Sequence, residues 1–222
     1  MANRGRRYIL PSNHVGSTRY MHQLYQDSMA IVRFFGRPTY FITFTANPQW
    51  PEIQSQLFEG QTCSDRPDIV ADVFQIKKVA FMADLKAGVL GPYAGHACTI
   101  EYQKRGLPHL HICVFIEPAE QGRWNDTTTV DQVICAELLD PAWDQDGSLR
   151  AIVTQVLVHG PCEGKACRPA THPANSQQCA KRYPKPFRPA TTPKEDGTAD
   201  YRRRDNGDTF TDPHTNRIID NT

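Results

Sequence analysis

Residues 101–116, EYQKRGLPHLHICVFI, decide the fold because they contain the end of one strand, a turn and a complete second strand. The second strand, 109–116, has two different faces, since successive side chains of a strand point in opposite directions. Its apolar face suits packing under helices and consists of Leu110, Ile112, Val114 and Ile116. The opposite face consists of His109, His111, Cys113 and Phe115. Both imidazoles therefore project from one surface, two residues apart.

The preceding strand, 96–103, supplies further polar groups to that surface. If KRGLP, 104–108, is a five-residue hairpin loop that turns at its glycine, Glu101 lies opposite His111 and Gln103 lies opposite His109. Directly opposed side chains are about 4.5–5.5 Å apart at Cβ. Two imidazoles and a carboxylate can hold a divalent cation with open positions, and such a cation can polarise a phosphate. The alternative is a solvated polar face, which is normal for an antiparallel sheet covered on one side.

Periodic patterns elsewhere predict an α+β fold, in which an antiparallel sheet is flanked by helices. Ser17 is a suitable N-cap and Gly36 a suitable stop for the first helix. The predicted elements are helices over 18–35, 67–87, 127–139 and 149–158, strands within 38–48 and over 96–103 and 109–116, and a short hairpin near 198–212. We expect a core over 8–158, followed by an extension over 159–222 that is rich in cysteine, proline and basic residues.

The 222-residue chain has a net charge of +1, but its basic residues cluster near the C-terminus. Residues 181–204 contain eight Lys and Arg against three Asp and Glu, which indicates an anion-facing segment. Its start, KRYPKPFR, interleaves bases with aromatic rings, a combination that suits the phosphates and nucleobases of single-stranded DNA. A solvated basic loop is the alternative. The candidate DNA-binding residues are Lys181, Arg182, Tyr183, Lys185, Phe187, Arg202, Arg203 and Arg204.

Seven cysteines in a chain without a signal peptide or a long apolar span indicate an intracellular protein whose thiols are free or bind metal. The candidate ligands of a tetrahedral structural Zn²⁺ site are His159, Cys162, Cys167 and Cys179. A loop with free thiols is the alternative there. The other candidates for structural roles, predicted to be core residues, are Cys98, Cys113 and Cys135.

Several long motifs occur in a familiar order: RYMHQLYQDSMAIVRFFGRPTYFITFTANPQWPEI, RPDIVADVF, IEYQKRGLPHLHI, HGPC, KRYPKPF and DGTADYRRRDNG. Over residues 8–222 the chain resembles the Rep-type nuclease region of Helitron rolling-circle transposon proteins, known as the Helitron helicase-like domain. The resemblance implies an HUH (His-hydrophobic-His) nuclease fold that holds Mg²⁺ or Mn²⁺ and acts on single-stranded DNA. His109 and His111 match the histidine pair, with Glu101 as the third ligand and Gln103 as the next candidate.

In the resembled family, a tyrosine on a helix after these motifs attacks DNA and stays attached to the 5′ phosphate. No such segment is recognisable here, so the catalytic residue is unknown, and we expect a fragment. Tyr20 and Tyr25 precede the histidines and are predicted to pack in the core. The ATP-binding loop of the family's C-terminal helicase domain is also not found. Two hypotheses follow: a nuclear, metal-dependent nicking domain without its nucleophile, or a non-catalytic DNA-binding remnant with a structural zinc knuckle.

Overall fold

The computed structural model describes residues 8–102, 106–140, 142–159, 179, 181–195, 197–213 and 216–222. The chain divides into two compact units, Met1–Gly122 and Arg123–Thr222. Among the described residues, no helix is both long and apolar enough to cross a membrane. Each unit is described by itself below.

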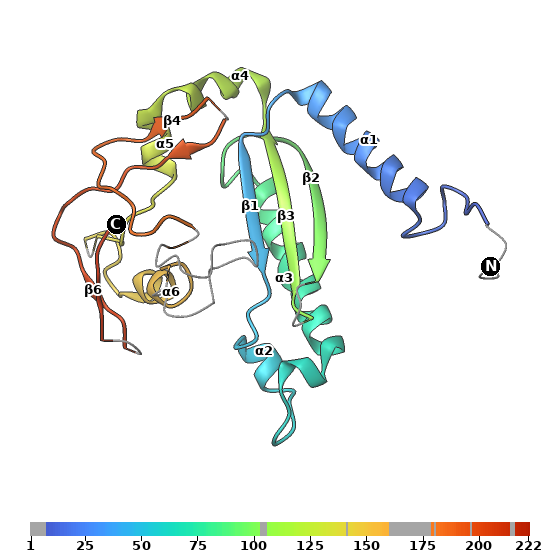
Figure 1. Cartoon of the computed structure of the whole chain (residues 1–222), viewed down its shortest axis with the longest axis horizontal. Coiled ribbons are helices and arrows are strands. Elements are labelled where there is room, and N and C mark those ends of the chain that lie inside the picture. The colour runs from blue at the N-terminus through green and yellow to red at the C-terminus, as the bar shows by residue number, and fades with distance from the viewer. Residues whose placement is uncertain are drawn as a thin grey trace, which may run out of the picture. The chain divides into compact units, whose positions relative to one another are not determined.

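The first unit is α+β, as predicted, and is built on one antiparallel sheet with the strand order β1-β3-β2. Figure 1 shows β3 between the other two strands. The elements are α1 (Thr18–Phe35), β1 (Tyr40–Thr45), α2 (Pro51–Gln54), a 3₁₀ turn (Cys63–Asp65), α3 (Pro67–Lys86), β2 (Tyr93–Tyr102), β3 (Pro108–Ile116) and α4 (Pro118–Gln121).

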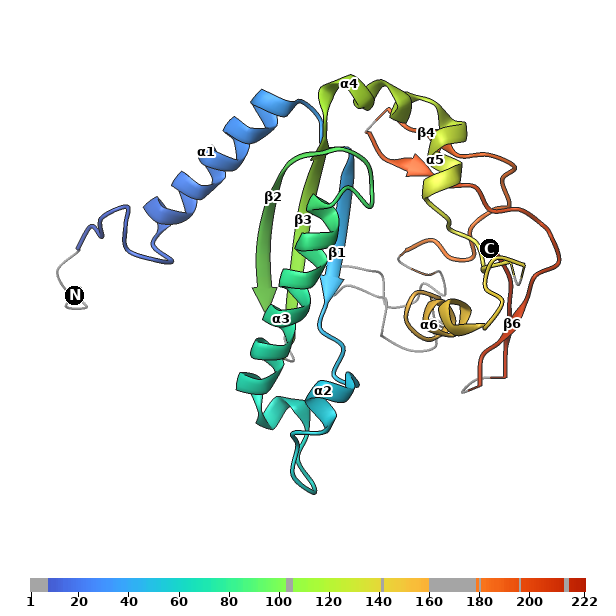
Figure 2. The same cartoon turned by 180° about the vertical axis from the view of Figure 1, so that it is seen from behind.

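The apolar face of β3 forms the centre of the core. Leu110, Ile112 and Val114 are buried there, and α3 covers this face, behind the sheet in Figure 1 and in front of it in Figure 2. The buried residues of α3 are Val70, Phe74 and Leu85. Burial of each large apolar side chain contributes about 1.5–3 kcal/mol, so this layer fixes which way β3 faces.

Helix α1 begins and ends where predicted but packs less than predicted. The Ser17 hydroxyl accepts a hydrogen bond from the backbone N–H of Tyr20 (3.2 Å), and Gly36 ends the helix at a φ of 82°. Only the last turn reaches the sheet, where Phe35 stacks on Phe115 with ring centroids 5.5 Å apart. The prediction that Tyr25 packs in the core is therefore wrong, since its side chain is 58% exposed.

The neighbouring Tyr20 on the same helix is half-buried rather than in the core. The first half of the apolar stripe of α1, including Met21 and Leu24, is also exposed. The helix runs away from the sheet in Figures 1 and 2, so no layer lies within reach of its first turns among the described residues. An amphipathic pattern thus predicts the helix correctly but not the burial of its apolar stripe.

The second unit contains α5 (Thr127–Val133), α6 (Ser148–Val156) and two small sheets, β4 (Thr192–Pro193) with β5 (Ala199–Asp200) and β6 (Phe210–Thr211) with β7 (Ile218–Ile219). The helix predicted over 127–139 is shorter, and two hairpins stand in place of the single one predicted near 198–212.

The two compact units divide at Gly122, earlier in the chain than the predicted division after residue 158. Long-range hydrogen bonds explain the difference. The backbone N–H of Leu138 donates to the Asn221 side chain (2.7 Å), and the Thr191 hydroxyl donates to Asp131 (2.5 Å). These contacts tie the segment around 131–138 to the C-terminal part of the chain.

Candidate functional site

Strand β3 carries His109 and His111 on the face of the sheet that α3 does not cover. Both imidazoles are half-buried, and their ring centroids lie 4.4 Å apart at an angle of 77°. The spacing of two residues in a strand produces this arrangement, because alternate side chains share a face. Two ring systems therefore meet on one open surface.

The hairpin register differs from the predicted one. Glu101 pairs with His109, and Thr99 pairs with His111, whereas the sequence suggested Glu101 opposite His111. The loop has the predicted five residues but starts one residue earlier, because Pro108 belongs to β3 and pairs with Tyr102. Proline is tolerated as the first residue of a strand. Because β3 begins at Pro108, every residue pair between β2 and β3 differs from the predicted one.

The carboxylate of Glu101 reaches the histidines despite this shift. Its Oε2 lies 3.5 Å from Nε2 of His111, diagonally across the β2–β3 pair. Gln103, the other candidate ligand from this strand, lies outside the described residues. Three of the four predicted ligands thus lie on one face of the sheet, with Glu101 beside His111 and His111 beside His109.

Strand β1 adds two contacts to the histidines that the sequence reasoning missed. Thr45 pairs with His109, and its Oγ1 lies 2.5 Å from Nδ1 of that ring. Phe41 stacks on His111 with ring centroids 5.7 Å apart and an interplanar angle of 14°. The alternation of β1 places Phe41 and Thr45 on one face, but only the pairing of β1 with β3 shows which face that is.

Glu101, His109 and His111 provide side chains of the types that bind divalent cations, but they are not arranged as a complete coordination site. Within the described part of the chain, no three His, Cys, Asp or Glu side chains stand assembled as a metal site. Nδ1 of His111 is buried and has no hydrogen-bond partner among the described residues, whereas Nε2 faces Glu101. Carboxylate oxygens suit Mg²⁺ and Mn²⁺, imidazole nitrogens suit other divalent transition metals, and a set of two imidazoles and one carboxylate leaves coordination positions open.

The sequence matches the model of a family described as the Helitron helicase-like domain at the N-terminus, over residues 1–114. This match covers more than half of the chain. The chain belongs to this Helitron family. A search among curated proteins gave no match. The Helitron match includes Thr45, Glu101, His109 and His111, so it covers the whole cluster on the open face of the sheet.

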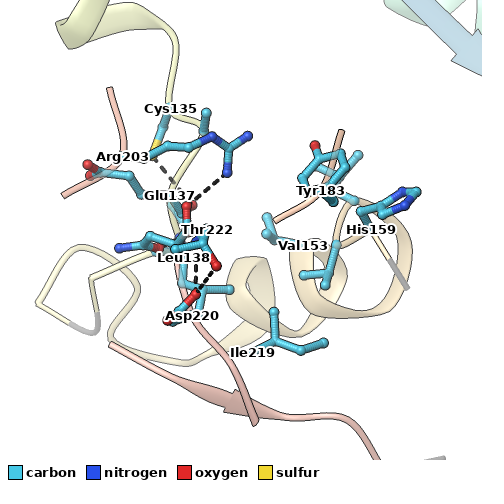
Figure 3. A pocket seen from close by; sticks show the side chains of 15 residues that line it. Cys135, Glu137, Leu138, Val153, His159, Tyr183, Arg203, Ile219, Asp220 and Thr222 are labelled. Atoms are coloured by element: carbon cyan, nitrogen blue, oxygen red, sulfur yellow. Dashed lines mark hydrogen bonds between the residues drawn. The ribbon is translucent and has the colours of Figure 1, made fainter. Parts of the chain in front are cut away.

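The second unit of this Helitron-family chain contains two of the four predicted zinc ligands. Nε2 of His159 lies 3.2 Å from Sγ of Cys179, although twenty residues separate them. Tyr183 stacks on His159 with ring centroids 4.2 Å apart, and Figure 3 shows the two side chains beside each other at a cavity of about 150 Å³. The other two candidates, Cys162 and Cys167, lie outside the described residues.

The predicted DNA-binding residues of the Helitron chain fall into two groups. Lys181 and Arg182 are exposed, and so is Phe187. The three consecutive arginines instead bind groups of the protein itself. Arg203 donates to the backbone carbonyl of Asn221 (3.0 Å) and lies over the ring of Tyr183, as Lys185 also does.

The other two arginines, Arg202 and Arg204, form ion pairs with Glu137, whose side chain is 2% exposed. Burial acts to raise the pKa of Glu137, but the hydrogen bonds and charge of Arg204 outweigh it and hold that pKa below its ordinary value. The buried carboxylate of Glu137 thus forms ion pairs with two arginines that the sequence analysis predicted to bind DNA.

Two of the three cysteines predicted to lie in the core are exposed, Cys98 and Cys135. Cys98 lies on β2, an outer strand of the sheet, and Cys135 follows the early end of α5. Cys113 is half-buried on the central strand, and burial raises the pKa of its thiol. The apolar sequence context of these cysteines therefore predicted at least partial burial correctly only for Cys113, which lies on the central strand.

Proposed function

We propose that this chain is an HUH-type endonuclease domain that nicks and transfers single-stranded DNA in rolling-circle transposition, with Mg²⁺ or Mn²⁺ as its cofactor. The convergence of Glu101, His109 and His111 on one open face carries the proposal. Membership of the Helitron helicase-like family supports it. Action on chromosomal DNA would place the protein in the nucleus.

In this proposal the two histidines and Glu101 hold the cation. The donors are two imidazole nitrogens and one carboxylate, and Nε2 of His111 is the nitrogen that faces Glu101. When bound, such a cation polarises a phosphate as a Lewis acid. The polar side chains around the cation would orient that phosphate on the open face of the sheet.

The sheet itself offers no tyrosine to this face. Tyr40, Tyr93 and Tyr102 pair with Val114, Ile116 and Pro108, respectively, and therefore lie on the side that α3 covers. The Tyr40 hydroxyl also donates to the backbone carbonyl of Leu90 (2.9 Å). A nucleophile for strand cleavage would consequently have to reach the histidine face from outside these three strands.

The test is cleavage of end-labelled single-stranded DNA in the presence of Mn²⁺, resolved on a denaturing gel. If a tyrosine from outside these three strands reaches the histidine face, the wild type nicks DNA in the presence of Mn²⁺, and His109→Ala/His111→Ala does not. His14→Ala, at an exposed histidine outside the sheet, serves as the matched control and should retain activity. Absence of Mn²⁺-dependent cleavage by the wild type would refute the proposed activity.

The contact between His159 and Cys179 favours a second candidate function, a non-catalytic module that binds single-stranded DNA and is stabilised by a structural Zn²⁺. Exposed Lys181, Arg182 and Phe187 would then contact the DNA. The measurement is the zinc content of purified protein, which should fall in His159→Ala and Cys179→Ser. DNA retention on a native gel without any nick would distinguish this module from the nuclease.

A further inference from the structure

We propose that Thr45 is a positioning residue that fixes the tautomer of His109, so that the Nε2 lone pair of this ring is available to the cation. The inference rests on the proposed function for the identity of the ligand, but the contact itself lies within the protein. Thr45 and His109 are direct partners in the β1–β3 pairing, and Thr45 Oγ1 lies 2.5 Å from Nδ1.

A neutral imidazole carries its proton on only one nitrogen, and a metal binds the other. If the protonated Nδ1 donates to the Thr45 oxygen, the lone pair remains on Nε2. If the hydroxyl donates to Nδ1 instead, Nε2 holds the proton and cannot bind a cation. Histidines that bind metals almost always donate from their second nitrogen, and the acceptor also fixes the orientation of the ring.

The backbone around Thr45 holds the hydroxyl in place. Thr45 is the last residue of β1, and the next residue, Ala46, is buried and donates from its N–H to the carbonyl of Pro108 (3.0 Å). The pairing of β1 with β3 therefore continues beyond the site. Threonine is also restricted at χ1 because it is branched at Cβ, so the contact costs little additional conformational entropy.

The two histidines are oriented differently. His111 has the ring of Phe41 against one side, and its buried Nδ1 has no hydrogen-bond partner in the part of the chain that the structure describes. Thr43, which pairs with His111, makes no hydrogen bond from its side chain to any described residue. The same strand thus contains a threonine that contacts a histidine nitrogen and, two residues away on the same face, one that does not.

The experiment compares Thr45→Val, Thr45→Ser and Thr43→Val with the wild-type chain of 222 residues. In the absence of metal, ¹⁵N NMR near pH 8, above the usual histidine pKa of about 6.5, reports which nitrogen of His109 is protonated. We expect the Nδ1–H form in the wild type and in Thr45→Ser, and its loss in Thr45→Val. Titration with Mn²⁺, followed by electron paramagnetic resonance, should show binding weakened about 10–100-fold in Thr45→Val alone.

An Nε2–H tautomer of His109 in the wild type would overturn the inference, as would wild-type Mn²⁺ affinity in Thr45→Val. Equal weakening in Thr43→Val would also overturn it, because the effect would then reflect the face as a whole. Failure of the proposed function is distinguishable: the wild type would bind no Mn²⁺, while the NMR spectrum would still establish the tautomer that Thr45 selects.

Discussion

Replacing Glu137 with glutamine tests whether the consecutive arginines hold the second unit together. Arg204 donates to the Glu137 carboxylate from its backbone N–H (2.7 Å), its Nε (3.1 Å) and its Nη2 (2.7 Å). Glutamine has nearly the same shape, but it has no charge, and one of its two terminal atoms is a donor that faces the donors of Arg204. The substitution therefore removes the ion pair while leaving the volume unchanged.

The magnitude follows from the burial of the two partners. Breaking a fully buried pair costs about 3–5 kcal/mol, and a hydrogen bond to a charged group contributes about 1.5–3 kcal/mol. The Glu137 side chain is 2% exposed, but the Arg204 side chain is 51% exposed, so water can solvate the guanidinium once it loses its partner. We therefore expect a loss of about 2–3 kcal/mol in the free energy of unfolding.

Urea unfolding monitored by circular dichroism measures this loss. With a slope near 2 kcal/mol per M, the midpoint should fall by about 1–1.5 M. Glu195→Gln, at an exposed carboxylate of the same unit, should leave the midpoint unchanged. A shift in Glu137→Gln no larger than in this control would refute the structural role of the pair.

The same variant has a signature in pH. Because the folded pKa of Glu137 is lowered, the stability that it contributes is complete above the unfolded pKa of about 4.3 and is lost as pH falls through the folded value. The difference between the wild type and Glu137→Gln should therefore be constant near neutrality and shrink below about pH 4.3. A difference that grows on acidification would contradict this argument.

Three further substitutions test the first unit. Gly95→Ala places a Cβ 2.9 Å from Cε2 of Phe35, so it should cost about 1–3 kcal/mol and speed hydrogen exchange in α1; unchanged protection would argue against this packing. Ser17→Ala removes the N-cap and should cost about 1 kcal/mol in a thermal melt, whereas an unchanged melt would mean that the cap contributes nothing. Burial and then Lys86 lower the pKa of His96, so unfolding should become easier as pH falls below about 6.5, and His96→Gln should lose this acid sensitivity.

Local signals in the sequence predict most of the first unit. Ser17 and Gly36 mark the ends of α1 because a cap and a residue with positive φ are requirements of the backbone at those positions. The alternation in 109–116 predicts the two faces of β3 because the period of a strand does not depend on its neighbours. Both features are properties of a single segment, and the structure confirms them.

The hairpin register is harder to predict, because two loops of five residues fit the same sequence. A loop that begins at residue 103 places Pro108 in the strand, and one that begins at 104 leaves it out. Neither choice violates a local rule, since proline is acceptable in both positions. Only the packing of the whole sheet selects between them, and the selection changes the partner of Glu101.

Contacts over long sequence separations could not be predicted from local patterns. Thr45 and His109 are 64 residues apart, and Glu137 and Arg204 are 67 residues apart. A cluster of bases looks the same in sequence whether it faces DNA or a buried carboxylate. The three arginines at 202–204 were therefore assigned by composition, whereas their partners depend on how the second unit folds.

The contact between Thr45 and His109 depends on the pairing of β1 with β3, and this dependence determines how the histidine site comes apart on heating. The β2–β3 hairpin closes over a few residues, but Thr45 reaches His109 only by closing 64 residues of chain, which is entropically more expensive. Both β1 and β2 are outer strands, but only β2 is joined to β3 by a short loop. Heating should therefore detach β1 and release His109 while the hairpin stays paired, so that the cation affinity of this face disappears at a lower temperature than the strand signal of the sheet.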